Sequence, residues 1–257
     1  MLEAEHIEAF RPVTLEEMDG IKLMNRIDTK FLTDEQTLML FLRDACGQGY
    51  RTLVTDGTRI ATYDSLYFDT PGLRMFMDHH NRHLVRQKVR TRVYLGSGLT
   101  FLEIKRKNNH GRTKKKRIRI SSGEFTDFGG DAAACDFLAS KSWFTSQELS
   151  PSLETMFRRI TLVNPAMTER LTIDINVSFR NLRTGNEASL RDAVIIELKQ
   201  DGRAESPAKA ILLKHRIKPV KISKYCIGIT LTAPAVKHNR FKPKVRRIEK
   251  QINSKLI

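Results

Sequence analysis

The sequence is poor in cysteine and has no long apolar run. Its three cysteines, Cys46, Cys135 and Cys226, are widely separated and fit neither a disulfide framework nor a zinc-binding spacing, so a reducing compartment is expected. A membrane-spanning helix needs about 18 consecutive apolar residues, and the apolar runs here, such as residues 194–196, are far shorter. Residues 1–5 lack the basic start and apolar core of a secretory signal. These absences together predict a cytoplasmic protein.

Acidic residues are scarce in two segments. The chain holds 45 Lys and Arg against 29 Asp and Glu, a net charge of +16. Residues 82–119 contain fourteen basic residues and one acid, Glu103, and residues 237–257 contain eight basic residues and one acid, Glu249. The rest of the chain is slightly acidic. Dense basic blocks imply a polyanionic partner: nucleic acid, anionic lipid, or a phosphate-rich molecule or polymer.

Composition and local patterns predict one α+β domain. Hydrophobic residues make up 40% of the chain, which suffices for a core, and the sequence shows no internal repeat or linker. Residues 1–236 are expected to form this domain, and residues 237–257 a basic tail that is either a surface helix or mobile. The expected strands are 59–69, 84–95, 100–107, 114–120, 169–180 and 190–200, with hairpin turns at 96–98 and 184–186. The expected helices begin near Thr14 and Thr33, and cover 131–162, broken at Ser150-Pro151, and 205–215.

Several expected strands carry charge on one face only. Side chains alternate between faces along a strand, and in residues 84–95 one face is a row of cations, Arg86, Lys88, Arg90 and Arg92, while the other is mostly apolar. The pattern recurs in residues 26–31, 101–107, 171–180 and 194–199. A solvated outer face explains any single strand, but like charges side by side in one sheet are costly unless water or anions compensate. The shared pattern predicts a closed or nearly closed antiparallel β-barrel with a cationic lumen and helices packed outside.

Five short segments in a fixed order carry a resemblance to a known family. They are Arg26–Phe31, Ser65–Asp69, Lys88–Tyr94, Phe101–Lys105 and Ser223–Tyr225. In this order they resemble the VTC domain, the polyphosphate polymerase domain of the vacuolar transporter chaperone family, in a bacterial-type stand-alone form. That family belongs to the CYTH-like triphosphate tunnel metalloenzymes, whose fold is an antiparallel β-barrel tunnel. The resemblance spans about residues 20–232.

The resemblance and the strand pattern together assign a role to each matching position. The implied catalytic cations are Lys30, Arg90, Arg92, Lys105, Arg159 (at the end of a helical insert) and Lys224. The implied phosphate-binding residues are Arg82, Arg86, Lys88, Lys107, Lys115, Lys116, Lys199 and Ser223, with Lys115 and Lys116 competing for one family position. The implied metal ligands are Glu197, Glu103 and Asp174.

Some of these assignments have alternatives. Glu103 could only orient Lys105, and Asp174 could pair with a lumen arginine instead of a metal. Glu197 and Lys199 could be an ordinary surface pair, and residues 114–117 an exposed patch. Phe157 stands where the family often has a tyrosine, so a hydroxyl contact to phosphate is lost or supplied elsewhere.

These residue types fit phosphoryl transfer along a polyanion. Arginine forks and lysine charges bind phosphate oxygens, and a carboxylate such as Glu197 would hold Mn²⁺ or Mg²⁺. The expected reaction transfers the γ-phosphate of ATP to inorganic polyphosphate. The resemblance leaves open a membrane-protein partner, and membrane association through that partner or the basic tail.

Two other functions remain open on the same fold. The first is a metal-dependent triphosphatase acting on inorganic triphosphate or on nucleotide or RNA 5′-triphosphates. Hydrolytic relatives often show Glu-x-Glu-x-Lys on the first strand, where residues 26–30 here read Arg-x-Asp-x-Lys, and this favours the polymerase. The second is a non-catalytic polyphosphate binder. Sequence-specific nucleic-acid binding is not expected, because the block 82–119 offers only Tyr94 and Phe101 for base stacking.

Overall fold

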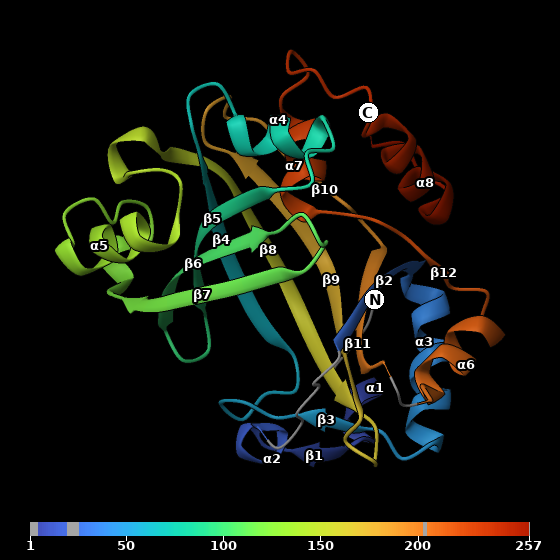
Figure 1. Cartoon of the computed structure of the whole chain (residues 1–257). Coiled ribbons are helices and arrows are strands. Elements are labelled where there is room, and N and C mark those ends of the chain that lie inside the picture. The colour runs from blue at the N-terminus through green and yellow to red at the C-terminus, as the bar shows by residue number, and fades with distance from the viewer. Residues whose placement is uncertain (1–4, 20–25, 203–204, 257) are drawn as a thin grey trace.

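A single large sheet organises the molecule (Figure 1). The structure, a computed structural model, describes residues 5–19, 26–202 and 205–256. Residues 1–4 and the expected start of the core at residue 20 lie outside the described residues, as does the side chain of Arg26. The strands are β1 (Arg11–Val13), β2 (Arg26–Asp34), β3 (Arg51–Leu53), β4 (Ala61–Asp69), β5 (Arg86–Tyr94), β6 (Leu99–Lys107), β7 (Thr113–Ile120), β8 (Ser150–Val163), β9 (Glu169–Asn181), β10 (Glu187–Ser189), β11 (Ala193–Asp201) and β12 (Lys218–Pro219).

The sheet runs in the order β12-β2-β11-β9-β8-β4-β5-β6-β7, with β3 and β10 attached to β8 and β9 at the sides. All pairings are antiparallel except that of β1 with β3. The expected hairpins β5–β6 and β9–β11 are both present. Within the described ranges, the terminal strands β7 and β12 do not pair with each other. The predicted antiparallel α+β fold is therefore confirmed, but its sheet is an open tunnel and not a fully closed barrel.

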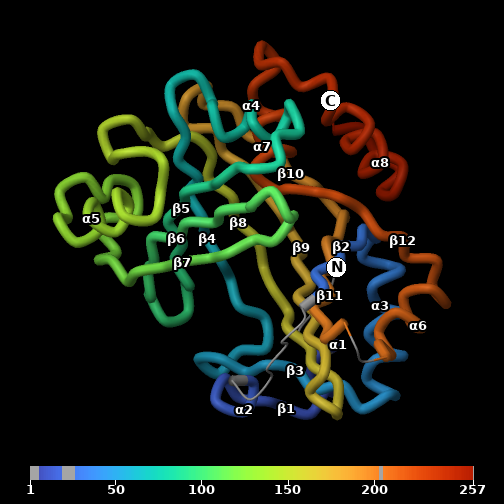
Figure 2. Tube along the Cα trace, viewed as in Figure 1, coloured from blue at the N-terminus to red at the C-terminus, as the bar shows by residue number. Residues whose placement is uncertain are grey.

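Helices cover both faces of the sheet (Figures 1 and 2). Helices α3 (Glu35–Gly47) and α6 (Pro207–Lys214) pack on the convex face against β9 and β11, and α5 (Ala132–Lys141) packs on the convex face against β6 and β7. Helix α7 (Lys224–Thr232) lies on the concave face, against β8 and β9. None of the described helices is both long and apolar enough to span a membrane. The helices are α1 (Glu5–Glu8), α2 (Leu15–Asp19), α3 (Glu35–Gly47), α4 (Arg74–His80), α5 (Ala132–Lys141), α6 (Pro207–Lys214), α7 (Lys224–Thr232) and α8 (Lys242–Ile252).

The position of α7 corrects the expectation that all helices pack outside. Residues Leu32, Phe157 and Ile195 lie on the concave face and share a buried cluster with Tyr225 and Ile229 of α7. A Cβ added at Gly228 would lie 2.4 Å from Leu153 and 2.6 Å from Phe179. The helix therefore approaches the sheet at a distance that only glycine allows, and it fills part of the lumen.

A β-bulge in β9 makes this packing possible. Met156 pairs with Ser178 and Arg158 with Ile175, so two residues of β9, Asn176 and Val177, oppose the single residue Phe157. Asn176 has φ = 50°, a left-handed conformation that asparagine tolerates better than most residues. If side chains alternated between the two faces without interruption along β9, Val177 and Phe179 would lie on the convex face. The bulge reverses the alternation, and both side chains pack under α7 on the concave face.

The expected helix over 131–162 is correct only in its first part. Residues 132–141 form α5, but residues 150–163 form β8, a fourteen-residue strand at the centre of the sheet. Pro151 lies at the start of this strand and does not break a helix. The sequence pattern does not indicate this strand, because both of its faces are covered and polar and apolar residues therefore do not alternate cleanly along it. Arg159 consequently lies on a central strand and not at the end of a helical insert.

Residues 237–257 contain a packed helix. Val245 and Ile248 of α8 are fully buried in the cluster that also holds Phe241 and Tyr225. Of the two expectations for this segment, the surface helix is the one observed. Helices α4 and α7 were not expected, and Ser223, placed near a last strand by the resemblance, is instead the N-cap of α7.

Candidate functional site

The charged rows predicted from alternation meet on the concave face. Strands β2, β11, β9, β8, β4, β5, β6 and β7 each contribute side chains to it, and the first turn of α7 adds Lys224. Three carboxylates lie among the cations: Glu103 on β6, Asp174 on β9 and Glu197 on β11. Each carboxylate has two cationic neighbours, and these three groups define the site.

The first group surrounds Glu103, which is fully buried. Arg90 Nε donates to Glu103 Oε2 at 2.8 Å, and Lys115 Nζ donates to Oε1 at 2.9 Å. Burial would raise the pKa of Glu103, but the cations Arg90, Arg92 and Lys115 outweigh it and hold this pKa far below its usual range. Glu103 thus orients Arg90 and Lys115 and makes no hydrogen bond to Lys105 among the described contacts.

The second group surrounds Asp174, which is 3% exposed. Arg159 donates from Nε to Oδ1 at 2.6 Å and from a terminal nitrogen to Oδ2 at 2.9 Å, and Lys224 Nζ also donates to Oδ2. Burial opposes ionisation, yet Arg159 and Lys224 hold the pKa of Asp174 well below its usual range. The alternative in which Asp174 pairs with a lumen arginine is the arrangement observed.

The third group surrounds Glu197. Lys30, its cross-strand neighbour on β2, donates to Oε1, and Lys199 Nζ lies 3.6 Å from Oε2. Burial would raise the pKa of Glu197, but Lys199 and Lys30 lower it strongly. Burial lowers the pKa of Lys199 to about 8, against the opposing effect of Glu197. The Glu197 side chain keeps 21% exposure, more than Glu103 or Asp174.

Arg92 and Lys105 lie at the centre of the site and lack an ion pair among the described residues. Arg92 is 7% exposed and donates only to the Ser65 hydroxyl, at 2.8 Å. Burial, followed by the neighbouring Arg90 and Arg159, lowers the pKa of Arg92 to about 10. Arg90, followed by burial, lowers the pKa of Lys105 well below its usual value. Both shifts combine burial with repulsion from neighbouring cations, because the positive charges at this site outnumber the three carboxylates.

Aromatic rings form the floor beneath these cations. Phe157 and Tyr63 are stacked with centroids 5.3 Å apart, and the side chains of Arg92, Arg159 and Lys224 lie 4.2–5.4 Å from the Phe157 centroid. Phe157 therefore holds cations through its ring face, a role that needs no hydroxyl.

Tyr67 is a site residue that sequence reasoning did not assign. Its hydroxyl accepts a hydrogen bond from Arg90 at 3.0 Å. Burial would raise the pKa of Tyr67, but Arg90 and other nearby cations lower it. The sequence contained one signal for this role. Tyr67 lies two residues after Ser65 on the same strand, so both side chains face the lumen.

The remaining predicted residues lie at the rim. Lys88 donates to Ser223 at 2.6 Å and so joins β5 to the start of α7. Arg82, Arg86 and Lys107 line a cleft of about 970 Å³ that also includes Lys30. Because this cleft is lined by β2 from one flank of the sheet and by β5 and β6 from the other, the two flanks face each other across it.

The structure separates the two lysines that competed for one position. Lys115 pairs across from Lys105 on the concave face and binds Glu103, whereas Lys116 pairs across from Ile104 and faces the opposite side. Lys116 therefore lies outside the site. All four of residues 114–117 are exposed, as the alternative interpretation held, although Lys115 also binds Glu103.

The three carboxylates do not form a joint metal centre. In the described part of the chain, no group of three or more His, Cys, Asp or Glu side chains is arranged to hold an ion. Glu103 and Asp174 are buried with both oxygens engaged by cations, and their assignment as metal ligands stays a prediction. Glu197 is more exposed. A divalent ion that takes one carboxylate and completes its shell with phosphate oxygens and water fits at Glu197.

Comparison with known families matches residues 25–233 to the VTC domain. This chain belongs to the VTC domain family. No curated protein matches it. Among solved structures, a proposed adenylate cyclase from Bacillus halodurans is 16% identical with a TM-score of 0.50, covering 78% of this chain and 96% of that one. A proposed adenylyl cyclase from Hippeastrum, described as having a dominant triphosphatase activity, is 11% identical with a TM-score of 0.47, covering 80% and 95%. At such identities the likeness concerns the fold alone.

The VTC domain thus presents an anion-binding surface of fixed geometry. Arg90 and Arg159 are each held by a carboxylate, and although burial opposes it, Tyr67 with Glu103 and Asp174 respectively raise their pKa values further. Both arginines stay charged at every physiological pH. A row of oriented guanidinium and ammonium groups can align phosphate groups and neutralise charge as it develops during phosphoryl transfer.

Proposed function

We propose that this VTC domain is an ATP-dependent polyphosphate polymerase, which transfers the γ-phosphate of ATP to the end of an inorganic polyphosphate chain. One observation carries the proposal. Every lumen carboxylate described above already lies between two cations, while Arg92 and Lys105 have no ion pair among the described residues. The excess charge is positive and lies along several strands, which suits a long polyanion.

The reaction needs little covalent help from the protein. A terminal phosphate oxygen of the chain attacks the γ-phosphorus and forms the new P–O bond. The bond from the γ-phosphorus to the bridging oxygen breaks, and its electron pair leaves on ADP. The attacking oxygen is already anionic, so no general base is required. Arg92 and Lys105 would offset the repulsion between the donor and acceptor phosphates.

A divalent metal ion fits the same scheme. Such an ion, Mn²⁺ or Mg²⁺, would be held by Glu197 and would neutralise phosphate charge when bound. A triphosphatase on this fold must instead activate water, for which carboxylates free to bind metal or accept a proton are useful. Glu103 and Asp174 are not free in this sense, and this favours the polymerase over the hydrolase.

The test incubates the purified protein with ATP and Mn²⁺ or Mg²⁺ and follows phosphorus species by ³¹P NMR. Internal-chain phosphate signals that grow together with ADP are expected. Lys105→Met and Glu197→Gln should reduce the signal by about a hundredfold or more, consistent with the loss of one transition-state electrostatic contact. Lys116→Met, which removes the same charge from the outer face of β7, should leave it unchanged.

Other outcomes would redirect the assignment. Free phosphate without chain signals would support the triphosphatase. Binding of ATP and polyphosphate without turnover would support a non-catalytic binder. Equal thermal unfolding temperatures of Lys105→Met and wild type would exclude loss of folding as the reason for lost activity.

A further inference from the structure

The C-terminal helix α8 contributes to a second cationic surface. The 970 Å³ cleft that holds Arg82, Arg86 and Lys107 is closed on one side by Arg240, Lys244 and Arg247. These three residues lie beyond residue 233, where the match to the VTC domain ends.

The lining is strongly positive. Its cations far outnumber its acids, of which Asp28 is the sole one among the described lining residues. Burial lowers the pKa of His79 to about 2, and the cations Lys88, Arg86, Lys244 and Lys107 lower it further. Burial also lowers the pKa of Lys244. Cations gathered this closely are stable only when water or a bound anion compensates them.

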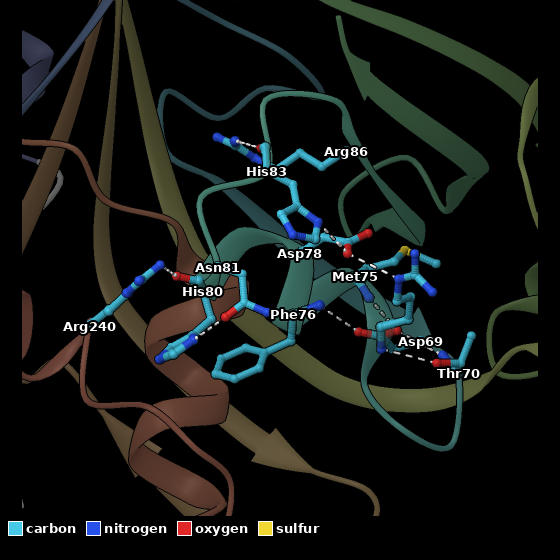
Figure 3. A network of polar contacts seen from close by, with 11 residues as sticks. Asp69, Thr70, Met75, Phe76, Asp78, His80, Asn81, His83, Arg86 and Arg240 are labelled. Carbon is cyan, nitrogen blue, oxygen red and sulfur yellow. Dashed lines mark hydrogen bonds and ion pairs between the residues drawn. The ribbon is translucent and has the colours of Figure 1, made fainter. Parts of the chain in front are cut away.

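Hydrogen bonds hold the cleft wall in place (Figure 3). His80 at the end of α4 contacts Asn239 Oδ1 at 2.8 Å, and Arg240 donates to the His80 carbonyl at 3.3 Å. Arg86 donates to the His83 carbonyl at 2.6 Å. At the other end of α4, the Asp69 carboxylate accepts from the backbone N–H groups of residues 75 and 76. The contacts of His80 hold residues 239 and 240, just before α8, against the end of α4, and α8 itself packs against β2, β11 and α7 with Val245 and Ile248 buried.

The cleft is continuous with the proposed reaction site. Lys30 lines the cleft and also binds Glu197. Arg86 lies on the same face of β5 as Arg90, about 13 Å away at the rise of a β-strand. A phosphate chain must be several units long to reach both positions.

We propose that this cleft binds the segment of a polyphosphate chain that lies beyond its reacting end, with Lys244 and Arg247 of α8 as phosphate ligands. This inference rests on the proposed function. A concave cleft fits a flexible linear polyanion, which can pass between α8 and α4. An anionic membrane is flat and would meet the cations on the outer side of α8, Arg246 and Lys250, which do not line the cleft.

The experiment compares two matched double variants of the full chain. Lys244→Gln/Arg247→Gln removes two charges from the cleft. Arg246→Gln/Lys250→Gln removes one lysine and one arginine from the same helix, outside the cleft. Binding of inorganic triphosphate and of long-chain polyphosphate is measured by calorimetry at fixed ionic strength, and binding to vesicles containing anionic lipid is measured in parallel.

Wild type is expected to bind the long chain more tightly than triphosphate. The cleft variant should lose about tenfold or more in affinity for the long chain, since two charge-assisted contacts are removed, while its affinity for triphosphate stays unchanged. The control variant should match wild type. An equal loss in both variants, or a loss confined to vesicles, would overturn the role of the cleft. Failure of wild type to bind either phosphate would instead overturn the proposed function.

Discussion

Substitution of Asp174 tests whether the buried carboxylates of the lumen are needed to stabilise its excess positive charge. Asp174→Asn keeps the shape of the side chain and removes the negative charge shared by Arg159 and Lys224. Both cations are then buried without an anion. Removing one partner of a buried ion pair costs about 3–5 kcal/mol, and the 3% exposure of Asp174 places it in this class. We expect the free energy of unfolding at pH 7 to fall by about this amount.

The loss should depend on pH and on ligand. Arg159 and Lys224 hold the pKa of Asp174 below its ordinary 3.8, so its stabilising effect is present above pH 4 and is lost as the pH falls further. The difference between wild type and variant should therefore shrink in acid. At neutral pH, inorganic triphosphate should restore more stability to the variant than to wild type, because the ligand supplies the missing negative charge. A ligand at a hundred times its Kd contributes about 2.7 kcal/mol.

The assay is urea denaturation followed by intrinsic fluorescence, with and without triphosphate, at pH 7 and in acid. Lys224→Met is the matched control, since it leaves Asp174 paired with Arg159 and removes one cation. It should cost less stability and should weaken stabilisation by triphosphate. A loss below about 1 kcal/mol in Asp174→Asn, or equal stabilisation of all three proteins by triphosphate, would refute the picture of a lumen with excess positive charge.

Two further substitutions probe other parts of the fold. Burial, followed by the neighbouring Glu154, raises the pKa of Asp64 to about 7. From pH 4 to pH 7 the unfolded chain therefore ionises at this position while the folded protein keeps the proton, so the stability of wild type falls. Asp64→Asn should gain stability over wild type across this range, by about 1 kcal/mol after solvent screening of this partly exposed group, in denaturation measured at several pH values. Gly228→Ala should cost about 1–3 kcal/mol, seen as a lower Tm, because its new methyl group meets Leu153 and Phe179; a Tm equal to that of wild type would show that α7 can shift away from the sheet.

Much of the site could be predicted because β5 obeys simple alternation. Arg90 and Arg92 lie on one face of an uninterrupted strand, so the two-residue period places them correctly. Prediction failed where the backbone departs from this period or where both faces of a strand are covered. The bulge at Asn176 reverses β9 without a strong local signal, since asparagine occurs in many other settings.

The pairing of charges could be predicted only in part: a pair between Asp174 and a lumen arginine was one of the alternatives, but the partners of Glu103 were not predicted. The choice of Lys115 over Lys105 as the partner of Glu103 depends on where β7 lies beside β6, which is a tertiary property. The same holds for α8, whose basic composition concealed the buried Val245 and Ile248. Two apolar residues three positions apart are a weak helical signal when the neighbours are lysine and arginine.

Among the described strands, β7 and β12 do not pair, and in the proposed polymerase this has a consequence for how the product leaves. A closed tunnel would encircle its product, and a long chain could leave only by sliding out through one end. An open sheet lets a chain depart sideways through the seam once its contacts break. Retention between successive additions then depends on electrostatic attraction, so chain length should fall as ionic strength rises. In the proposed polymerase, processivity would then be set by ionic strength and not by topology.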